Sequence, residues 1–255
     1  MPLTKPYYQI SRQLEDGSYS RSGNAGYIDH PKYAVSPERR VRAYNILQKD
    51  FLNLLEYIEP ADQNLQTFSY RTHELLMLAC IEFEANCKSI FTVHNYVSKR
   101  KNMNIENYFL IEKSHRLSGY RIKITHWREG EKILQPFSKW ETSHSLEWYD
   151  TYNTTKHDRV VTFHEATFEK MLNAICGLLI ILTAQFQSED FSSPSYYLTG
   201  DRKDNFYFAI GKYFLVEYPM NWEVDERYGF NWESLKGESD PFQKFDYASL
   251  AKQSK

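Results

Sequence analysis

The segment from about residue 165 to about residue 186 is almost wholly apolar, and it limits the fold more than any other part of the sequence. Its longest apolar stretch, Ala174 to Ala184, is eleven residues long and is flanked by Asn173 and Gln185. A helix that crosses a bilayer needs about 20 apolar residues. We therefore predict a core helix that other helices must cover on most sides.

A helix beginning after Ser36 is the first candidate to cover this core. Ser36 supplies a hydroxyl N-cap, Pro37 suits the first helical position, and Glu38 faces the positive end of the helix dipole. Apolar residues then recur every three or four positions until Pro60. The spacing predicts a long amphipathic helix that ends at this proline.

A second long helix is predicted from about Phe68 to about Tyr96, and it carries two neighbouring apolar faces. Extending one face at intervals of three and four residues places Glu84 among residues destined for the interior. A buried carboxylate requires a partner. Either Glu84 is paired inside the protein, or tertiary packing rotates it to the boundary of the core.

The remaining elements complete a mainly α, α+β fold. We expect a shorter helix over 105–117, a β-hairpin over about 119–137, a helix over 146–159 capped by Ser143 or Ser145, and a strand over 205–218. Residues 1–34 read as an extended lead-in to a helical domain over 35–188. The segment 189–255 reads as a strand and an aromatic wrap on the same domain.

Composition excludes several classes of protein. Thirty-one Lys and Arg against thirty-three Asp and Glu give a formal charge of −2, so there is no global attraction for nucleic acid or an anionic membrane. The three cysteines are few and odd in number, and the first residues lack the apolar stretch of an export signal. We expect a reduced, cytoplasmic protein without a membrane partner.

Common catalytic and ligand-binding motifs are missing from the sequence. There is no C-x-x-C, H-E-x-x-H or EF-hand spacing for a metal, and no glycine-rich phosphate loop or G-x-S-x-G. We therefore expect neither a metal nor a cofactor. The residues that can carry chemistry lie elsewhere, in the polar string over 148–159.

On a helix this string gathers amide, imidazole and cationic side chains within about two turns. Asn153 and His157 lie on one face, and Tyr152, Lys156 and Arg159 lie on the adjacent one. An imidazole can transfer a proton, and cations can hold a phosphate. The pattern therefore favours phosphodiester chemistry.

The chain resembles the HEPN superfamily of bacterial helical bundles over roughly residues 36–186. The family motif is an arginine, usually followed by Asn, His or Asp, then three residues and a histidine; Asn153 and His157 match its second half, and Tyr152 stands at the arginine position. The chain also resembles a set of bacterial proteins with a W-x-x-x-Y-N-x-x-K-H-x-R string, matched by residues 148–159.

This resemblance implies a metal-independent endoribonuclease in phage defence or a toxin–antitoxin system. Family members form dimers in which Arg and His of two protomers share one cleft, and the RNA 2′-hydroxyl attacks its own phosphate. Here the resemblance implies His157 as acid and base, Asn153 orienting it, and Lys156 and Arg159 binding phosphate. Glu84 and Tyr152 would support the site. A homodimer and an RNA or protein partner are the expected partners.

Other interpretations of these residues remain open. His157 can be a structural histidine bonded to Glu84 or to a backbone carbonyl, and Arg159 can pair with His164 instead. The run 99–101 is either a solvated helix end or part of a phosphate-binding patch with Arg116, Arg121, Lys123 and Arg128. The whole chain can equally be a catalytically inactive HEPN-like binding or scaffold subunit.

Overall fold

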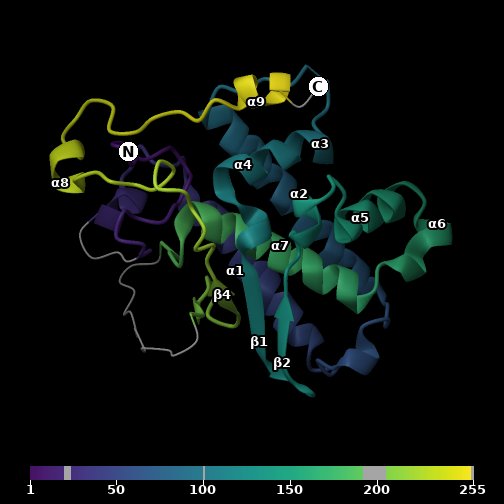
Figure 1. Ribbon diagram of the computed structural model, residues 1–255. Coiled ribbons are helices and arrows are strands. Elements are labelled where there is room, and N and C mark those ends of the chain that lie inside the picture. The colour runs from purple at the N-terminus through teal and green to yellow at the C-terminus, as the bar shows by residue number, and fades with distance from the viewer. Residues whose placement is uncertain (20–23, 100, 192–204, 254–255) are drawn as a thin grey trace.

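The computed structural model describes residues 1–19, 24–99, 101–191 and 205–253, and its centre is helix α7, Phe168–Phe186 (Figure 1). Helices α1 (Pro37–Leu54), α2 (Tyr70–Val93) and α5 (Glu147–His157) pack around it. From Ala174 to Phe186 every residue of α7 is buried. The prediction of a core helix is therefore confirmed, and so is the mainly α, α+β fold class.

Helix α7 is long and apolar enough to cross a membrane, and within the described ranges it is alone in this. Most of its residues are buried by the rest of the chain. Burial in the bundle accounts for its composition. The indole ring of Trp148 on α5 packs closely against the backbone of α7 at Gly177. Any larger residue would clash there, because its Cβ would lie 2.9 Å from Cζ2 of Trp148. A glycine here allows α5 to rest directly on α7.

The ends of the two long helices differ in part from the expectation. Ser36 has a positive φ of 48° and makes no side-chain capping bond, so the predicted hydroxyl cap is wrong, although Pro37 does begin α1. The helix ends at Leu54, and turns lead to Pro60. Helix α2 begins with a capping box in which the Ser69 hydroxyl accepts from the backbone of Thr72.

The predicted helix over 105–117 is divided into short pieces. Helix α3 spans Ile105–Tyr108, and α4 spans Glu112–His115. Arg116, with a φ of 49°, ends α4 in the left-handed conformation, three residues before the glycine that was expected to end the helix. The chain therefore turns early, toward the strands.

The sheet joins the hairpin to the C-terminal strand. Strands β1 (Arg121–Trp127) and β2 (Gly130–Leu134) confirm the hairpin, and the expected strand over 205–218 is two short ones, β3 (Tyr207–Phe208) and β4 (Leu215–Glu217). The order is β2-β1-β4-β3, and all neighbours are antiparallel. Ring contacts of Trp127 and Phe214 hold the sheet against α7 and α1.

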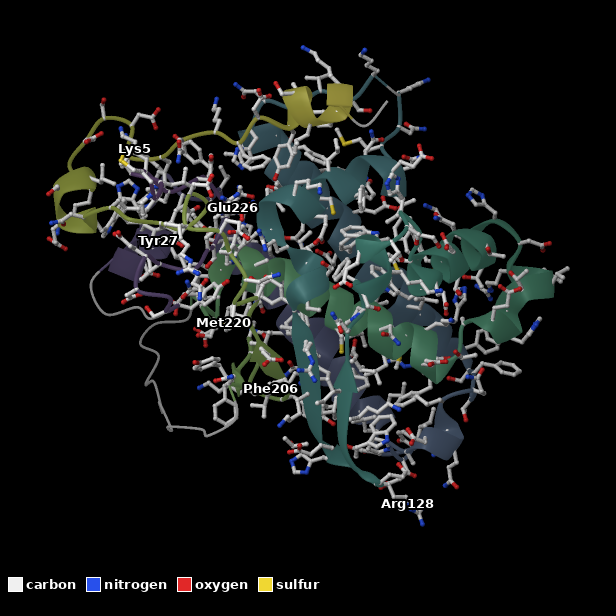
Figure 2. The ribbon with its side chains drawn as sticks, viewed as in Figure 1. Lys5, Tyr27, Arg128, Phe206, Met220 and Glu226 are labelled. Carbon is white, nitrogen blue, oxygen red and sulfur yellow. The ribbon has the colours of Figure 1, made fainter. Side chains whose placement is uncertain are left out.

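The terminal segments pair with each other, forming what we call the terminal wrap, residues 2–19 and 219–253. The backbone of Tyr228 bonds to Gln13 and Glu15, and Gln243 bonds to Pro6. Tyr27 forms edge contacts with Tyr228 and neighbouring rings. Figure 2 shows Lys5, Tyr27 and Glu226 on this same side of the molecule. The predicted aromatic wrap is present in the described residues, whereas 192–204 of the C-terminal segment lie outside them.

The remaining helices are short. They are α6 (Arg159–Thr162), α8 (Trp232–Leu235), α9 (Tyr247–Gln253) and the 3-10 turns η1 (Asn24–Asp29), η2 (Asp62–Asn64), η3 (Phe109–Ile111), η4 (Leu117–Gly119), η5 (Ser138–Glu141) and η6 (Phe163–Glu165). In Figure 1, α5 and α6 lie at the edge opposite to α8 and the N-terminus. The predicted site and the terminal wrap are therefore on different sides of the molecule.

Candidate functional site at the junction of helices α5 and α6

Helix α5 presents its polar string to solvent from the bundle surface. Trp148, Tyr152 and Thr155 are buried on the side that faces the bundle, and His157 is exposed on the opposite side. The helix begins at Glu147 with Leu146 at the N-cap position, so neither Ser143 nor Ser145 caps it. Packing of the apolar side, rather than a capping bond, sets how α5 is oriented.

The helix ends at His157, which changes the predicted geometry of the cations. Asp158 leaves the helical conformation, with φ −136° and ψ 63°, and its carboxylate accepts from the backbone of Val161 at the start of α6. Arg159 therefore belongs to α6 and not to the face of α5 on which the sequence pattern placed it. We call residues 156–162 the α5–α6 junction.

Glu84 does not support His157. Its carboxylate accepts a hydrogen bond from the Tyr149 hydroxyl at 2.8 Å and pairs with Lys88 at 3.0 Å. The Glu84 side chain is 18% exposed, so packing has placed it at the boundary of the core. Burial and the Glu84 carboxylate together raise the pKa of Tyr149. Glu84 therefore anchors α5 to α2.

Lys156 lies over the ring of Tyr152, one turn earlier on α5. Its ammonium donates to the Tyr152 hydroxyl at 3.0 Å and lies 4.9 Å from the centre of that ring. This hydrogen bond is the main cause of the raised pKa of Lys156. The Tyr152 side chain is itself buried. Tyr152 thus positions a cation at the surface of the helix.

His157 is exposed, and its side chain makes no hydrogen bond in the part of the chain that the structure describes. The alternative in which it is a buried histidine bonded to Glu84 is therefore wrong. Asn153 is half-buried, and no hydrogen bond joins it to His157 among the described residues. The amide lies one turn before the imidazole without holding it.

Arg159 turns toward the N-terminus of α2. Its guanidinium lies 5.5 Å from the ring centre of Tyr70, and His164, with which it was the alternative pair, is 6.4 Å from the ring of Phe68. Both side chains are exposed. Contacts of Arg159 with Tyr70 and of His164 with Phe68, at and just before the start of α2, therefore take the place of a pair between the two side chains.

A histidine that the sequence pattern did not single out lies beneath this region. His73 is 8% exposed, packs against the ring of Phe163 at 5.5 Å, and leaves its Nε2 without a hydrogen bond. Burial, and then the charge of Arg159, lower the pKa of His73. Since His73 is on α2 and Arg159 on α6, periodicity within either helix gave no signal of their proximity.

The second basic patch considered from the sequence has three of its cations paired with carboxylates. Arg121 pairs with Glu217 at 2.8 Å, Lys123 pairs with Glu131 at 3.2 Å, and Arg116 pairs with Glu226. Arg100 lies outside the described residues. Three cations of this patch are therefore neutralised by carboxylates of the same chain, whereas Lys99, Lys101 and Arg128 are exposed.

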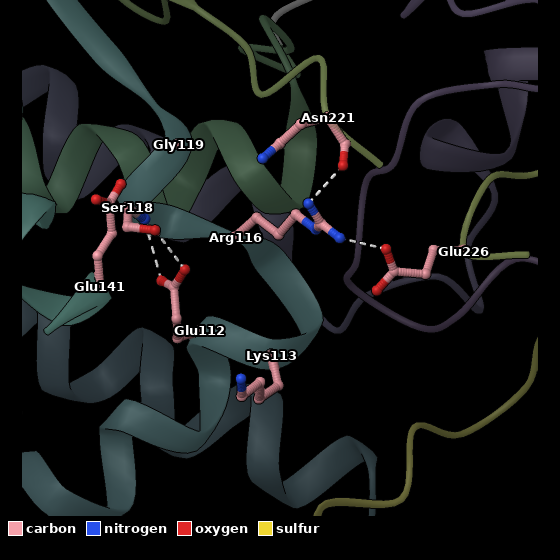
Figure 3. A pocket seen from close by; sticks show the side chains of 8 residues that line it. All are labelled: Glu112, Lys113, Arg116, Ser118, Gly119, Glu141, Asn221 and Glu226. Atoms are coloured by element: carbon pink, nitrogen blue, oxygen red, sulfur yellow. Dashed lines mark hydrogen bonds and ion pairs between the residues drawn. The ribbon is translucent and has the colours of Figure 1, made fainter. Parts of the chain in front are cut away.

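A polar cavity of about 250 Å³ opens between α4 and the terminal wrap (Figure 3). Its charged side chains largely bond within the protein, since Ser118 donates twice to Glu112 and Arg116 donates to the Asn221 carbonyl as well as pairing with Glu226. Burial raises the pKa of Glu112. None of the residues predicted for the site on α5 lines this cavity, although Arg116 of the second basic patch does. Its paired charges favour a structural role.

Among the described residues, no three His, Cys, Asp or Glu side chains are grouped closely enough to hold a metal ion. The three cysteines are buried and unpaired, as expected for small apolar side chains.

Comparison with protein-family models, with curated proteins and with solved structures gives no match to this chain. The resemblance to HEPN proteins therefore rests on the motif residues alone.

Proposed function

We propose that this chain is an RNA-directed, HEPN-like protein that holds RNA phosphates at the α5–α6 junction and cleaves the strand through His157. The observation that carries the proposal is that Lys156, His157 and Arg159 are all exposed within four consecutive residues of the junction, while no carboxylate pairs with either cation in the described ranges. Unpaired cations at a surface attract the phosphate backbone without help from the net charge.

The proposed reaction needs one proton acceptor and one site of positive charge. The 2′-hydroxyl attacks the adjacent phosphorus and gives its proton to the imidazole of His157. The bond from phosphorus to the 5′-oxygen breaks, leaving a 2′,3′-cyclic phosphate, and the leaving oxygen takes a proton from water. Lys156 and Arg159 balance the charge that develops on the phosphate oxygens.

Binding is tested by titrating a fluorescein-labelled, unstructured 20-nucleotide RNA. We expect the double variant Lys156→Ala, Arg159→Ala to weaken binding at low salt, with each lost phosphate contact lowering the salt slope by about 0.7. The matched control removes two exposed cations of α1, by Arg42→Ala and Lys49→Ala. Equal affinity of both double variants and the unmodified protein would rule out the junction as the RNA site.

Cleavage is tested with His157→Ala, and with His126→Ala as the matched control, because His126 is an exposed histidine of the hairpin. We expect loss of the 2′,3′-cyclic phosphate product for His157→Ala only, and no product from RNA with 2′-deoxy sugars. Cleavage that survives His157→Ala would exclude His157 from the reaction.

A catalytically inactive binding subunit is the second candidate function. The position of the motif arginine holds the buried Tyr152, and Arg159 is turned toward Tyr70 on α2. Both features favour a surface that binds without cleaving. Binding by the unmodified protein with no cleavage of any RNA tested would select this function over the first.

A further inference from the structure

We propose that exposed rings beside the junction stack on unpaired bases of the RNA, which makes the ligand a single strand with open bases. The surface consists of the exposed Phe68 and Tyr70 and the half-buried Phe163, and we call it the aromatic platform. This inference rests on the proposed function, since it concerns the same end of the molecule. It assigns a role in base recognition to residues that the sequence motif does not contain.

The platform is a contiguous group of rings. The Tyr70 and Phe163 ring centres are 4.7 Å apart, and those of Phe68 and Phe163 are 6.0 Å apart. Tyr70 is nevertheless 70% exposed and Phe68 is 49% exposed. The rings thus support each other and leave a large apolar area in water, as is typical of a surface that binds a partner.

The backbone beneath the platform is held in place by local hydrogen bonds. Phe68 forms an antiparallel bridge with Thr167, and the backbone of Phe168 donates to Thr67 at 2.7 Å. The capping box at Ser69 fixes the first turn of α2, from which Tyr70 projects. Rings held in this way lose little freedom when a ligand stacks on them.

The charge next to the platform favours a nucleic acid over a neutral apolar partner. Arg159 lies 5.5 Å from the Tyr70 ring and has no carboxylate partner within the described segments. Arg71, the next cation, is already paired with Glu74 at 2.6 Å. A phosphate near Arg159 and a base on Tyr70 would satisfy both side chains, which is how single-strand binders combine cations with rings.

Stacking of a base on Tyr70 also indicates that the RNA is single-stranded where it binds. Bases in a duplex are stacked on each other and leave their faces covered, whereas an unpaired base exposes a face to an aromatic ring. Apolar side chains of α6 extend the surface, since Val160 and Val161 are also exposed. The platform is therefore suited to a loop or an unstructured strand.

The test compares Tyr70→Ala, Tyr70→Phe and Tyr207→Ala in binding a 20-nucleotide single strand and the corresponding duplex. Tyr207 is an exposed tyrosine on β3, which pairs with β4, and Figure 1 shows β4 and α6 in different parts of the molecule. We expect Tyr70→Ala to weaken single-strand binding about 10-fold or more, and Tyr70→Phe and Tyr207→Ala to change it less than 2-fold. We expect duplex binding to be weaker than single-strand binding and insensitive to Tyr70→Ala.

Each other outcome overturns the platform. If Tyr70→Ala binds the single strand normally while the Lys156 and Arg159 double variant binds weakly, the platform is wrong and the proposed function stands. If the unmodified protein binds neither RNA, both fail. If Tyr70→Ala instead turns a dimer into a monomer in sedimentation, with RNA affinity unchanged, the rings contact a second copy of the chain. Far-UV circular dichroism checks that each variant is folded.

Discussion

A histidine near the terminal wrap is buried, whereas a histidine at the α5–α6 junction is exposed to solvent. The comparison distinguishes a side chain that stabilises the fold from one that can contact a ligand. At the terminal wrap, His115 is fully buried and its Nε2 donates to the carbonyl of Gln9 at 2.9 Å. At the α5–α6 junction, His157 is exposed and no hydrogen bond engages it within the described residues. The imidazole of His115 is already bonded to the N-terminal segment, whereas the imidazole of His157 can bond to a ligand.

Cations show the same contrast. Arg12 of the wrap is buried, donates to the carbonyls of Ser114 and Glu226, and lies 4.6 Å from the ring centre of Trp222. Arg116 lies 4.7 Å from the same ring. Lys156 and Arg159 of the junction are exposed and contact one ring each. We infer that the wrap contributes to stability and that the junction contributes little to it.

The largest expected effect comes from removing the ring that joins the wrap to the bundle. Trp222 is 1% exposed, and its indole nitrogen donates to the Tyr19 hydroxyl at 2.7 Å. Trp222→Ala removes this bond and both guanidinium contacts, so we expect it to lower the free energy of unfolding by about 3–5 kcal/mol. Tyr70→Ala is the matched change at the other end, with an expected loss below about 1 kcal/mol. Urea unfolding measures both, and equal losses would contradict the contrast.

Acid is expected to weaken the wrap before it affects the junction. Burial lowers the pKa of His94 to about 4 and that of His115 to about 3. Both are neutral when folded, and Nδ1 of His94 accepts from the backbone of Phe245 at 2.9 Å, a bond that protonation of this atom would remove. The unfolded chain binds protons from about pH 6.5 downward, so stability is full above that pH and falls as pH decreases toward 4.

The expected slope is at most about 1.4 kcal/mol per pH unit for each histidine. Urea unfolding between pH 7.5 and 5 measures it, with His115→Gln as the variant and His126→Gln as the exposed control. We expect His115→Gln to be less stable at pH 7.5 and to show a shallower slope. If the free energy of unfolding of His115→Gln depends on pH as steeply as that of the unmodified protein, His115 does not cause the loss of stability in acid.

The smallest expected effect is at the junction itself. His157→Ala removes an exposed side chain, so we expect its melting temperature and its free energy of unfolding, within about 0.5 kcal/mol, to match those of the unmodified protein. Differential scanning calorimetry measures this. A large loss of stability would show that His157, like His115, contributes to the stability of the fold.

Local patterns in the sequence predict the main helices and the hairpin. The apolar stripe of α1, the wide apolar arc of α2 and the run in α7 each require burial of a particular face, whatever the neighbours are. The alternation in β1 and the turn at Gly130 are equally local. These elements could be predicted because their signals lie within a few residues of each other.

The candidate site was only partly predictable, because its geometry depends on residues distant in the sequence. The string over 148–157 does lie on one helix, and its Lys156 and His157 are exposed. The break at Asp158 moves Arg159 to α6, where its neighbour is Tyr70, from a helix that begins almost ninety positions earlier. Periodicity describes one helix at a time and carries no information about such contacts.

The sequence by itself determined the three long helices α1, α2 and α7, the burial of α7, and the position of the polar string on a helix that begins near Trp148. Only the tertiary structure decided that Glu84 bonds to Tyr149 instead of His157, that β4 joins the hairpin through β1, and that the termini pair with each other. The physical reason is the distance along the sequence over which each kind of signal acts. Apolar periodicity acts between residues one turn apart, whereas the partner of a polar group is set by which elements the packing brings within hydrogen-bonding distance.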